Sequence, residues 1–176
     1  CLAPDAGNYR YEEALQWTWF KTSAAHNTVT LGEENQRETC GRLVDFVTDA
    51  NGSCVVVDAE TYPGVLHRRE ITVAGSAVTV EDVIEGAPDG AMLVWRMNSF
   101  APVSVAGNTA TVIRPEDSFT VKALSDDVEI TVAPAPLMGE RSQDGGEYMK
   151  GWQVRAAKRV AHKSERILIR LEFKSV

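Results

Sequence analysis

The chain has 176 residues, of which 44% are hydrophobic, so it is long enough to bury a core and short enough to form one domain. Its 25 acidic residues outnumber its 18 basic residues and give a net charge of -7, which argues against a nucleic-acid partner or an anionic membrane. No apolar run approaches the ~18 residues of a membrane span.

The first 25 residues lack a regular period, and we treat 1–25 as an irregular N-terminal segment of a single domain that covers 1–176. Within it, the stretch 12–20 is compatible with one or two helical turns or with an irregular edge strand, because its aromatic residues fit neither period.

From residue 26 onward, polar and apolar residues alternate in short stretches rich in Val, Ile, Thr and aromatic residues, a pattern typical of strands. Such stretches lie at 26–31, 42–48, 53–61, 65–74, 77–86, 91–100, 102–107, 109–115, 118–124, 127–134, 151–161 and 166–173. Turn residues separate many of them, at 49–52, 74–76, 88–90, 107–108, 115–117 and 125–127. The spacing predicts an all-β fold, an antiparallel β-sandwich of about a dozen strands.

Two later segments carry separate expectations. The stretch 134–152 is rich in Pro and Gly and predicts a long surface loop before a last hairpin. The basic stretch 155–166 could contact a polyanion, but we favour a charge-protected edge hairpin. Trp95 and Trp152 fall on strands and are expected in the core, although an exposed tryptophan could instead stack on the face of a sugar.

The three cysteines match no zinc-site spacing. A hairpin turn at 49–52 would set Cys54 opposite Val47 and leave Cys40 about seven residues, roughly 23 Å, along the partner strand. Since a disulfide needs Cα atoms within about 7 Å, we expect three free thiols. The start at Cys1 in place of a methionine suggests a piece of a longer chain.

Two candidate site residues lie in the N-terminal segment. His26 follows three small residues and precedes Asn27, so its imidazole could point into a site; it could equally be a hydrogen-bonded histidine at a strand end. Asp5 begins an Asp-Ala-Gly sequence, which could be an ordinary turn. Neither residue alone decides between these alternatives.

Together these motifs resemble a known signature. The pattern D-x-G-x-Y-x-Y at 5–11, then F-K-x-S-A-A-H-N-T-V-T at 20–30 and G-x-x-N-Q at 32–36, resembles the β-domain of heparinase II/III-like polysaccharide lyases. The Y-x-G-x-x-H-x-R pattern at 62–69 and the V-x-V-x-D-x-I-x-G pattern at 78–86 extend the resemblance. Lys21 stands where the family usually has arginine, which would weaken planar recognition of a carboxylate or sulfate.

The resemblance implies a metal site. It makes Asp5 and His26 two of three protein ligands of a structural zinc ion, with the third, a histidine, on a segment upstream of this chain. Two imidazole nitrogens, one carboxylate and a water would complete a tetrahedral site. The site in this chain alone is therefore expected to be incomplete.

The resemblance also implies a reaction. The family cleaves uronic-acid-containing polysaccharides by β-elimination, and the groups that move protons lie mainly in an N-terminal α/α-toroid that is absent here. We therefore expect no catalytic residue in this chain; Tyr9, Tyr11 and Tyr148 are expected to be packing or surface aromatics. Substrate contacts are expected from Arg69, Lys21 and Asn27, although Arg69 could simply pair with neighbouring acids.

The function expected from this resemblance is that of one wall of a lyase substrate cleft, inactive alone, whose partners are the missing toroid and an acidic polysaccharide. Two alternatives stay open: a non-catalytic carbohydrate-binding or scaffolding module, and a metal-linked domain that only stabilises its neighbour. The substrate class suggests a bacterial protein of the periplasm or the extracellular space.

Overall fold

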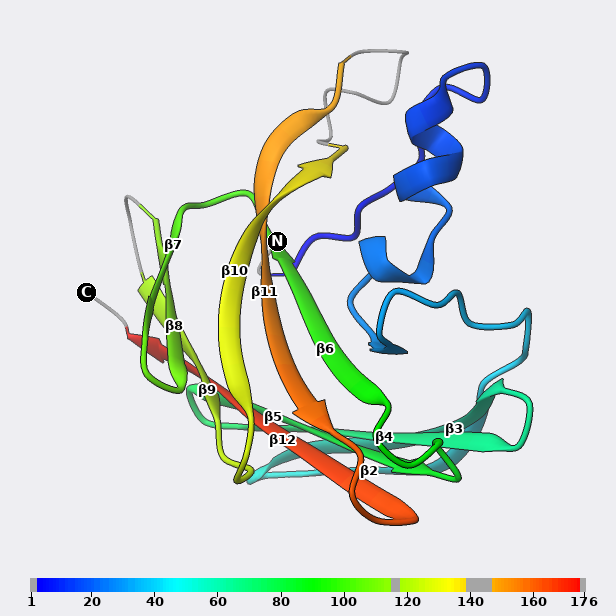
Figure 1. Ribbon diagram of the computed structural model, residues 1–176. Coiled ribbons are helices and arrows are strands. Elements are labelled where there is room, and N and C mark those ends of the chain that lie inside the picture. The colour runs from blue at the N-terminus through cyan, green and yellow to red at the C-terminus, as the bar shows by residue number, and fades with distance from the viewer. Residues whose placement is uncertain (1–2, 115–117, 139–146, 175–176) are drawn as a thin grey trace.

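The computed structural model describes residues 3–114, 118–138 and 147–174, and in this part of the chain nearly all regular structure is β (Figure 1). Two short helical segments, η1 (Gln16–Phe20) and η2 (Ser23–Ala25), precede the strands. The strands are β1 (Val29–Leu31), β2 (Arg42–Asp49), β3 (Gly52–Tyr62), β4 (Val65–Ala74), β5 (Ala77–Glu85), β6 (Met92–Ser99), β7 (Val103–Ala106), β8 (Thr109–Ile113), β9 (Ser118–Ala123), β10 (Glu129–Leu137), β11 (Met149–Arg159) and β12 (Ser164–Lys174).

The strands form two antiparallel sheets, which confirms the predicted sandwich. The small sheet has the order β1-β6-β11-β10, and the large sheet has the order β2-β3-β4-β5-β12-β9-β8-β7. Figure 1 shows β6, β10 and β11 crossing over β5 and β12, while β2 and β3 extend the large sheet to one side. The large sheet is therefore only partly covered by the small one.

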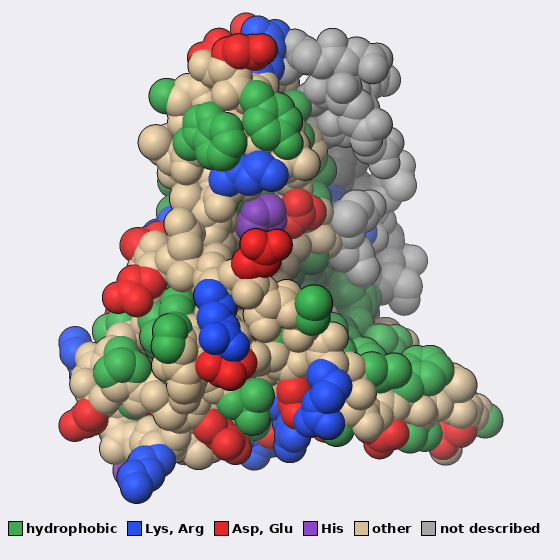
Figure 2. Space-filling view, turned by 90° about the vertical axis from the view of Figure 1, so that its right-hand side faces the viewer, with side chains coloured by type: hydrophobic (Ala, Val, Ile, Leu, Met, Phe, Trp, Pro, Cys, Tyr) green, Lys and Arg blue, Asp and Glu red, His purple; other side chains and the backbone are tan. Residues whose placement is uncertain are grey.

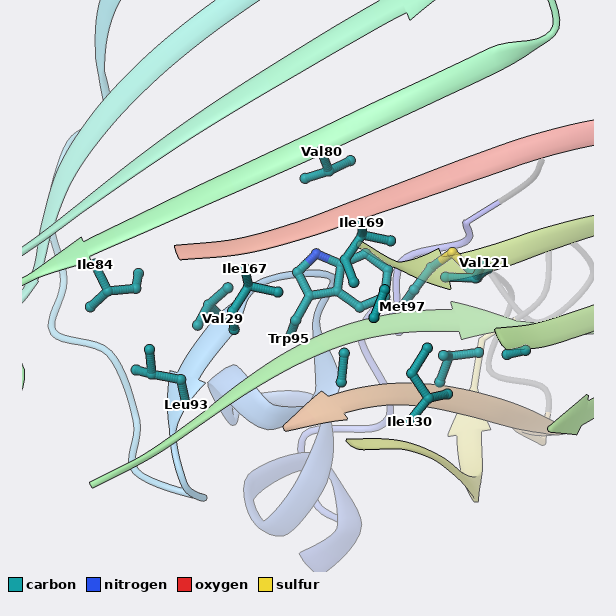
Figure 3. Close-up of a cluster of buried hydrophobic side chains, with 14 of the residues drawn as sticks. Val29, Val80, Ile84, Leu93, Trp95, Met97, Val121, Ile130, Ile167 and Ile169 are labelled. Atoms are coloured by element: carbon teal, nitrogen blue, oxygen red, sulfur yellow. The ribbon is translucent and has the colours of Figure 1, made fainter. Parts of the chain in front are cut away.

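The main core lies between the two sheets (Figure 3). Alternate residues of β6, including Trp95 and Met97, point inward and meet Ile167 and Ile169 of β12 and Val80 of β5. Each of these side chains is at most 8% exposed, and fully burying one large apolar side chain stabilises a fold by about 1.5–3 kcal/mol. The alternation that predicted the strands also predicts which face of β6 meets the large sheet.

A second, smaller cluster holds the N-terminal segment on the other face of the small sheet. Its buried members are Ala6, Phe20, Ala25, Ala135 and Leu137. In addition, the indole Nε1 of Trp19 donates a 2.8 Å hydrogen bond to the Pro136 carbonyl on β10. Most of the segment is thus packed against the outer face of the small sheet, while Ala3 contacts the main core.

The expectation of a surface loop over 134–152 is wrong at both ends. β10 continues to Leu137 and β11 starts at Met149, so Pro134 lies opposite Trp152. Pro134 and Pro136 are tolerated because β10 is an edge strand, where a missing N–H on the open side breaks no ladder. Residues 139–146 and the expected turn at 115–117 lie outside the described part of the chain.

The edge hairpin expected over 155–166 is also wrong. β11 lies between β6 and β10 in the small sheet, and β12 lies between β5 and β9 in the large sheet. The connection therefore crosses from one sheet to the other. The first expected strand is shorter than predicted, since β1 begins at Val29, and the 12–20 stretch contains a π-helical turn in place of an edge strand.

The cysteine geometry agrees with the prediction where the structure describes it. Val47 lies opposite Cys54 across the β2–β3 hairpin, and both Cys40 and Cys54 are free thiols. Cys1 lies outside the described residues. None of the helical segments in the described ranges has the length and apolar character that a membrane-spanning helix needs.

Candidate functional site

Asp5 and His26, the two proposed metal ligands, lie side by side. His26 Nδ1 is 2.7 Å from Asp5 Oδ1, which confirms the expectation that the two side chains meet. The side chains are 38% and 60% exposed, so both can be reached from solvent. One carboxylate oxygen and one imidazole nitrogen therefore face each other at the surface.

Local backbone structure holds each of the two groups. His26 follows η2 with an extended backbone, and its Nε2–H donates a 3.1 Å hydrogen bond to the Phe20 carbonyl. The Gly7 N–H donates a 2.8 Å bond to Asp5 Oδ2. Gly7 has φ +82°, and a Cβ there would lie 2.8 Å from Met138 Cβ, so this turn requires glycine.

The electrostatics of the pair favour its charged form. The hydrogen bond from His26 lowers the pKa of Asp5, and burial opposes this shift in part. The hydrogen bond to Asp5 raises the pKa of His26, against partial burial. Because a carboxylate and a carbonyl can only accept, both contacts of the ring are hydrogen bonds when both ring nitrogens carry protons, and the geometry fits an aspartate–imidazolium ion pair.

Asn27 ties this pair to the sheet. Its Nδ2 donates to the carbonyls of Ala3 and Pro4, at 3.1 Å each, and its Oδ1 accepts a 2.8 Å bond from the Asn98 N–H on β6. Asn27 follows His26 in sequence, and Pro4 precedes Asp5. One side chain therefore fixes both backbone segments that carry the pair.

A charged cluster on β4 and β5 holds the backbone of Asn27 in place. Arg69 on β4 donates through Nε and Nη2 to the two carboxylate oxygens of Asp82 on β5, at 2.7 and 3.1 Å. His67 Nε2 lies 2.5 Å from Asp82 Oδ1. The third nitrogen, Arg69 Nη1, donates a 2.8 Å bond to the Asn27 carbonyl.

The Asp82 carboxylate stays charged in this cluster although it is fully buried. Burial alone would raise the pKa of Asp82, but the positive charge of Arg69 and the hydrogen bond from His67 outweigh it and lower the pKa. The expected pairing of Arg69 with a neighbouring acid is confirmed. Its expected contact with substrate stays a prediction. In this structure all three guanidinium nitrogens of Arg69 already have partners inside the protein.

Lys21 and the tyrosines lie around the same segment. Lys21 is exposed, and its ammonium lies 5.7 Å from the centre of the Tyr11 ring. The tyrosines pack against other rings, as expected: Tyr9 stacks on Phe20, and Tyr148 meets Tyr9 edge-on. On the face shown in Figure 2, basic and acidic side chains alternate around a histidine, so this face has no continuous basic patch.

A second polar cluster was missed by the sequence reasoning. Arg96 on β6 is fully buried on the outer face of the small sheet and donates to Gln153 Oε1 on β11 at 3.0 Å and to Glu33 Oε1 at 2.8 Å. Asn98 and Gln153 donate to the carbonyls of Ala25 and Ala24. Polar residues at alternating positions of a strand are typical of an exposed face, and no sequence pattern showed that the N-terminal segment covers this one.

An open groove of about 360 Å³ lies along the large sheet beside His67 and Arg69. Its floor is the inner face of β3 and β4 beyond the small sheet, where His67 and Arg69 lie, and Thr28 and Gln36 form its wall. Gln36 is fixed there by a 2.9 Å hydrogen bond from its Nε2 to the Val29 carbonyl. The groove combines apolar strand residues with the buried charged cluster at one end.

The Asp5–His26 pair has the donor chemistry of a partial zinc site. The Phe20 carbonyl holds the Nε2 proton, which leaves Nδ1 to face Asp5, and metal-binding histidines commonly have their second nitrogen held in this way. Among the described residues, no group of three or more His, Cys, Asp or Glu side chains could hold a metal ion. A third protein ligand would have to come from outside these residues.

Comparison with known proteins identifies a family for this chain. The family model "Heparinase II/III-like, C-terminal" matches residues 2–172. A heparin-sulfate lyase of Bacteroides stercoris is 29% identical over 96 residues, which are 52% of this chain and 14% of that protein.

Solved structures share the fold. The heparan sulfate lyase HepC from Pedobacter heparinus matches 99% of this chain with a TM-score of 0.85 and 17% identity, and a heparinase III matches 97% with a TM-score of 0.81 and 17% identity. The chain spans only 28% and 27% of those two chains. Since the family model covers nearly every residue and the fold agrees, the chain belongs to the heparinase II/III-like C-terminal family.

Proposed function

We propose that this chain is the β-sandwich domain of a longer polysaccharide lyase that cleaves uronic-acid-containing polysaccharides by β-elimination. The single observation that carries the proposal is the Asp5–His26 pair, whose side chains meet at 2.7 Å within the family's matched region. In this role the chain forms one wall of the substrate cleft and supplies two ligands of a zinc site. We also propose that the protein is bacterial and acts in the periplasm or outside the cell, where such polymers are found.

β-Elimination sets the tasks of the cleft. A base removes the proton at C5 of the uronate, nearby polar groups neutralise its carboxylate, and an acid protonates the leaving glycosidic oxygen. We assign the acid and base to the part of the longer protein that this chain lacks. This chain itself would form one wall of the cleft and hold two zinc ligands in position.

Three features of the chain support this positioning role. Phe20 holds the His26 ring so that Nδ1 faces Asp5, and Asn27 fixes the backbone on both sides of the pair. Zinc bound here would link the N-terminal segment to the part of the longer protein that supplies the third ligand, because a tetrahedral zinc site needs more ligands than this pair. Binding would displace the Nδ1 proton of His26, since zinc requires a neutral imidazole.

Of the expected substrate contacts, Lys21 is the one whose charged group is exposed beside the pair, and we propose it as a direct contact to an acidic sugar. Arg69 and Asn27 contribute through the backbone that they hold. A lysine in place of a planar guanidinium gives a point-charge contact and therefore less geometric selectivity.

The test is made on the complete protein that contains this sequence. Its reading frame should encode an N-H-x-H-x-D segment just upstream of Cys1 and a helical domain before that. The purified protein should contain about one zinc per chain and produce unsaturated uronate absorbance from heparan sulfate, heparin or alginate. Asp5→Asn and His26→Gln should lower the zinc content, while the exposed control Asp126→Asn should leave it unchanged. Absence of both the upstream motif and the helical domain would contradict the proposal.

A further inference from the structure

A second pocket, of about 470 Å³, lies at the ends of β10 and β11, away from the Asp5–His26 pair. Pro134 lies opposite Trp152 and Pro136 opposite Lys150, so these four side chains project from one face of the small sheet. Tyr148, Ala135 and Gly151 complete the lining. The volume falls within the range of about 300–1,000 Å³ typical of small-molecule sites.

The other face of the same two strands is already occupied. Ala135 and Leu137, at the alternate positions of β10, pack in the small cluster with Phe20. At Gly151 a Cβ would lie 2.3 Å from Leu137 Cδ1, which shows how closely that face is filled. The pocket therefore lies on the opposite face from most of the N-terminal segment and meets that segment only where Tyr148 contacts Tyr9, among the described residues.

The pocket walls are flat and apolar. Trp152 is partly exposed, and the rings of Pro134 and Pro136 lie beside it on the neighbouring strand. Tyr148 is 40% exposed at the rim and is held edge-on by Tyr9, with ring centres 5.8 Å apart. A rigid indole with adjacent proline rings suits a flat ligand with one apolar face, such as the C–H face of a pyranose ring.

The pocket also has a cation of its own. Lys150 is exposed on the pocket face, and within the described ranges its ammonium forms no ion pair. The chain as a whole carries a net charge of -7, and most of its buried or half-buried cations are paired with acids, as Arg69 is with Asp82. An unpaired ammonium beside an aromatic wall is complementary to an anionic sugar.

We propose that this pocket is a sugar-binding subsite for one acidic pyranose residue. The apolar ring face packs on Trp152, and the carboxylate or sulfate pairs with Lys150. The ligand is an acidic saccharide and not a neutral one, because the cation is the one charged group that lines the pocket among the described residues. The subsite goes beyond the proposed lyase role, since it does not involve Asp5, His26 or zinc.

The test is a titration of the purified 176-residue chain with a sulfated uronate-containing disaccharide prepared from heparin. Binding is followed by tryptophan fluorescence and by the indole N–H signals in NMR spectra. Trp152→Ala should weaken binding about tenfold, which is the loss expected when an aromatic contact of roughly 1.4 kcal/mol is removed. Trp17→Ala is the matched control, because Trp17 is 57% exposed and lies elsewhere.

Two further arms separate charge from stacking. Lys150→Gln should weaken binding of the acidic disaccharide and leave the weak binding of neutral cellobiose unchanged, while Lys122→Gln on β9 should change neither. Trp152→Phe keeps a ring at this position and should retain most of the affinity, so it controls for misfolding of the alanine variant.

Equal affinities of the Trp152→Ala and Trp17→Ala variants, or no binding at millimolar disaccharide, would overturn the subsite. Equal binding of cellobiose and the acidic disaccharide would also overturn it. These outcomes leave the lyase proposal intact, because its test measures zinc content and turnover of the longer protein.

Discussion

Arg69 and Asn27 lie 42 positions apart in sequence, and a 2.8 Å hydrogen bond from Arg69 Nη1 to the Asn27 carbonyl connects the large sheet to the N-terminal segment. Both carboxylate oxygens of Asp82 accept hydrogen bonds from the same arginine, so the guanidinium that contacts Asn27 is itself held in place. The position of His26, the residue before Asn27, is thus set partly by a charge pair in the large sheet.

Asn27→Ala should destabilise the chain and loosen the Asp5–His26 pair. The substitution removes three hydrogen bonds of a half-buried side chain and leaves the Asn98 N–H without its partner, which costs about 1–3 kcal/mol. Urea unfolding measures the free energy, and the Nδ1 proton signal of His26 in NMR spectra reports the pair. Asn51→Ala, in the exposed turn after β2, is the control; equal effects of the two variants would contradict a positioning role.

Gly7→Ala should cost more stability than Gly64→Ala. Both glycines have positive φ, of +82° and +73°, so both variants carry a backbone strain of roughly 1–2 kcal/mol. Only at Gly7 would the new Cβ also meet a neighbour, Met138 Cβ at 2.8 Å, which adds about 1–3 kcal/mol of overpacking. Thermal unfolding of the two variants gives the difference, and similar melting temperatures would show that the turn at Asp5 relaxes freely.

Asp82→Asn should destabilise the chain strongly at neutral pH. It leaves the Arg69 guanidinium, whose side chain is only 22% exposed, without its counter-charge, and breaking such a pair costs about 3–5 kcal/mol. The pKa of Asp82 is lowered from 3.8 in the folded chain, so its contribution is complete above pH 3.8 and is lost as pH falls through the folded-state pKa.

The difference between wild type and Asp82→Asn should therefore narrow as the pH falls below 3.8. Urea unfolding between pH 2 and pH 7 measures it. The control is Asp126→Asn in the exposed turn before β10. A difference that stays constant down to pH 2 would mean that folding does not lower the pKa of this carboxyl group.

Ile169→Ala should lower the free energy of unfolding by about 2–5 kcal/mol, the range for deleting an aliphatic side chain from a packed core. Ile169 is fully buried on β12, a central strand of the large sheet. Ile113→Ala on β8 is the matched control, because Ile113 is 53% exposed. Urea unfolding of both variants gives the comparison, and similar losses would contradict the packing between the sheets.

The 176-residue chain alone should have no lyase activity. We assign the proton-transferring groups of the cleft to another part of the longer protein, so absorbance of unsaturated uronate should stay at background with heparan sulfate, heparin and alginate. A commercial heparin lyase serves as the positive control. Clear turnover by the isolated chain would show that its own residues complete an active site.

Alternation of side chains was sufficient to predict most of the fold. Each strand from β2 to β9 overlaps a predicted stretch, because the inward residues that build the core, such as Trp95 and Met97, recur at every second position. The order of strands within the sheets was not predictable, since pairing across the sandwich depends on contacts between distant segments. A loop was predicted where β10 continues through Pro134 and Pro136, because the sequence does not distinguish proline on an edge strand from proline in a loop.

The site was predictable only in part. The resemblance identified Asp5 and His26, and the structure brings them together. It did not indicate the internal partners of Arg69 and Asn27, because hydrogen bonds to backbone carbonyls leave no pattern in the sequence. Nor did it reveal Arg96, whose burial depends on coverage by a segment more than 60 residues away, as its bond to Glu33 across 63 positions illustrates.

The division into two hydrophobic clusters determines which part of the chain unfolds locally. Most of the main core comes from strand residues, while the N-terminal segment rests mainly on the small cluster and on hydrogen bonds from Asn98 and Gln153. The segment can therefore detach as a separate cooperative unit without exposing Trp95 or Ile169 to water. In amide hydrogen exchange, residues 5–25 should exchange together and sooner than β6 and β12, and a metal shared with another domain would slow that exchange.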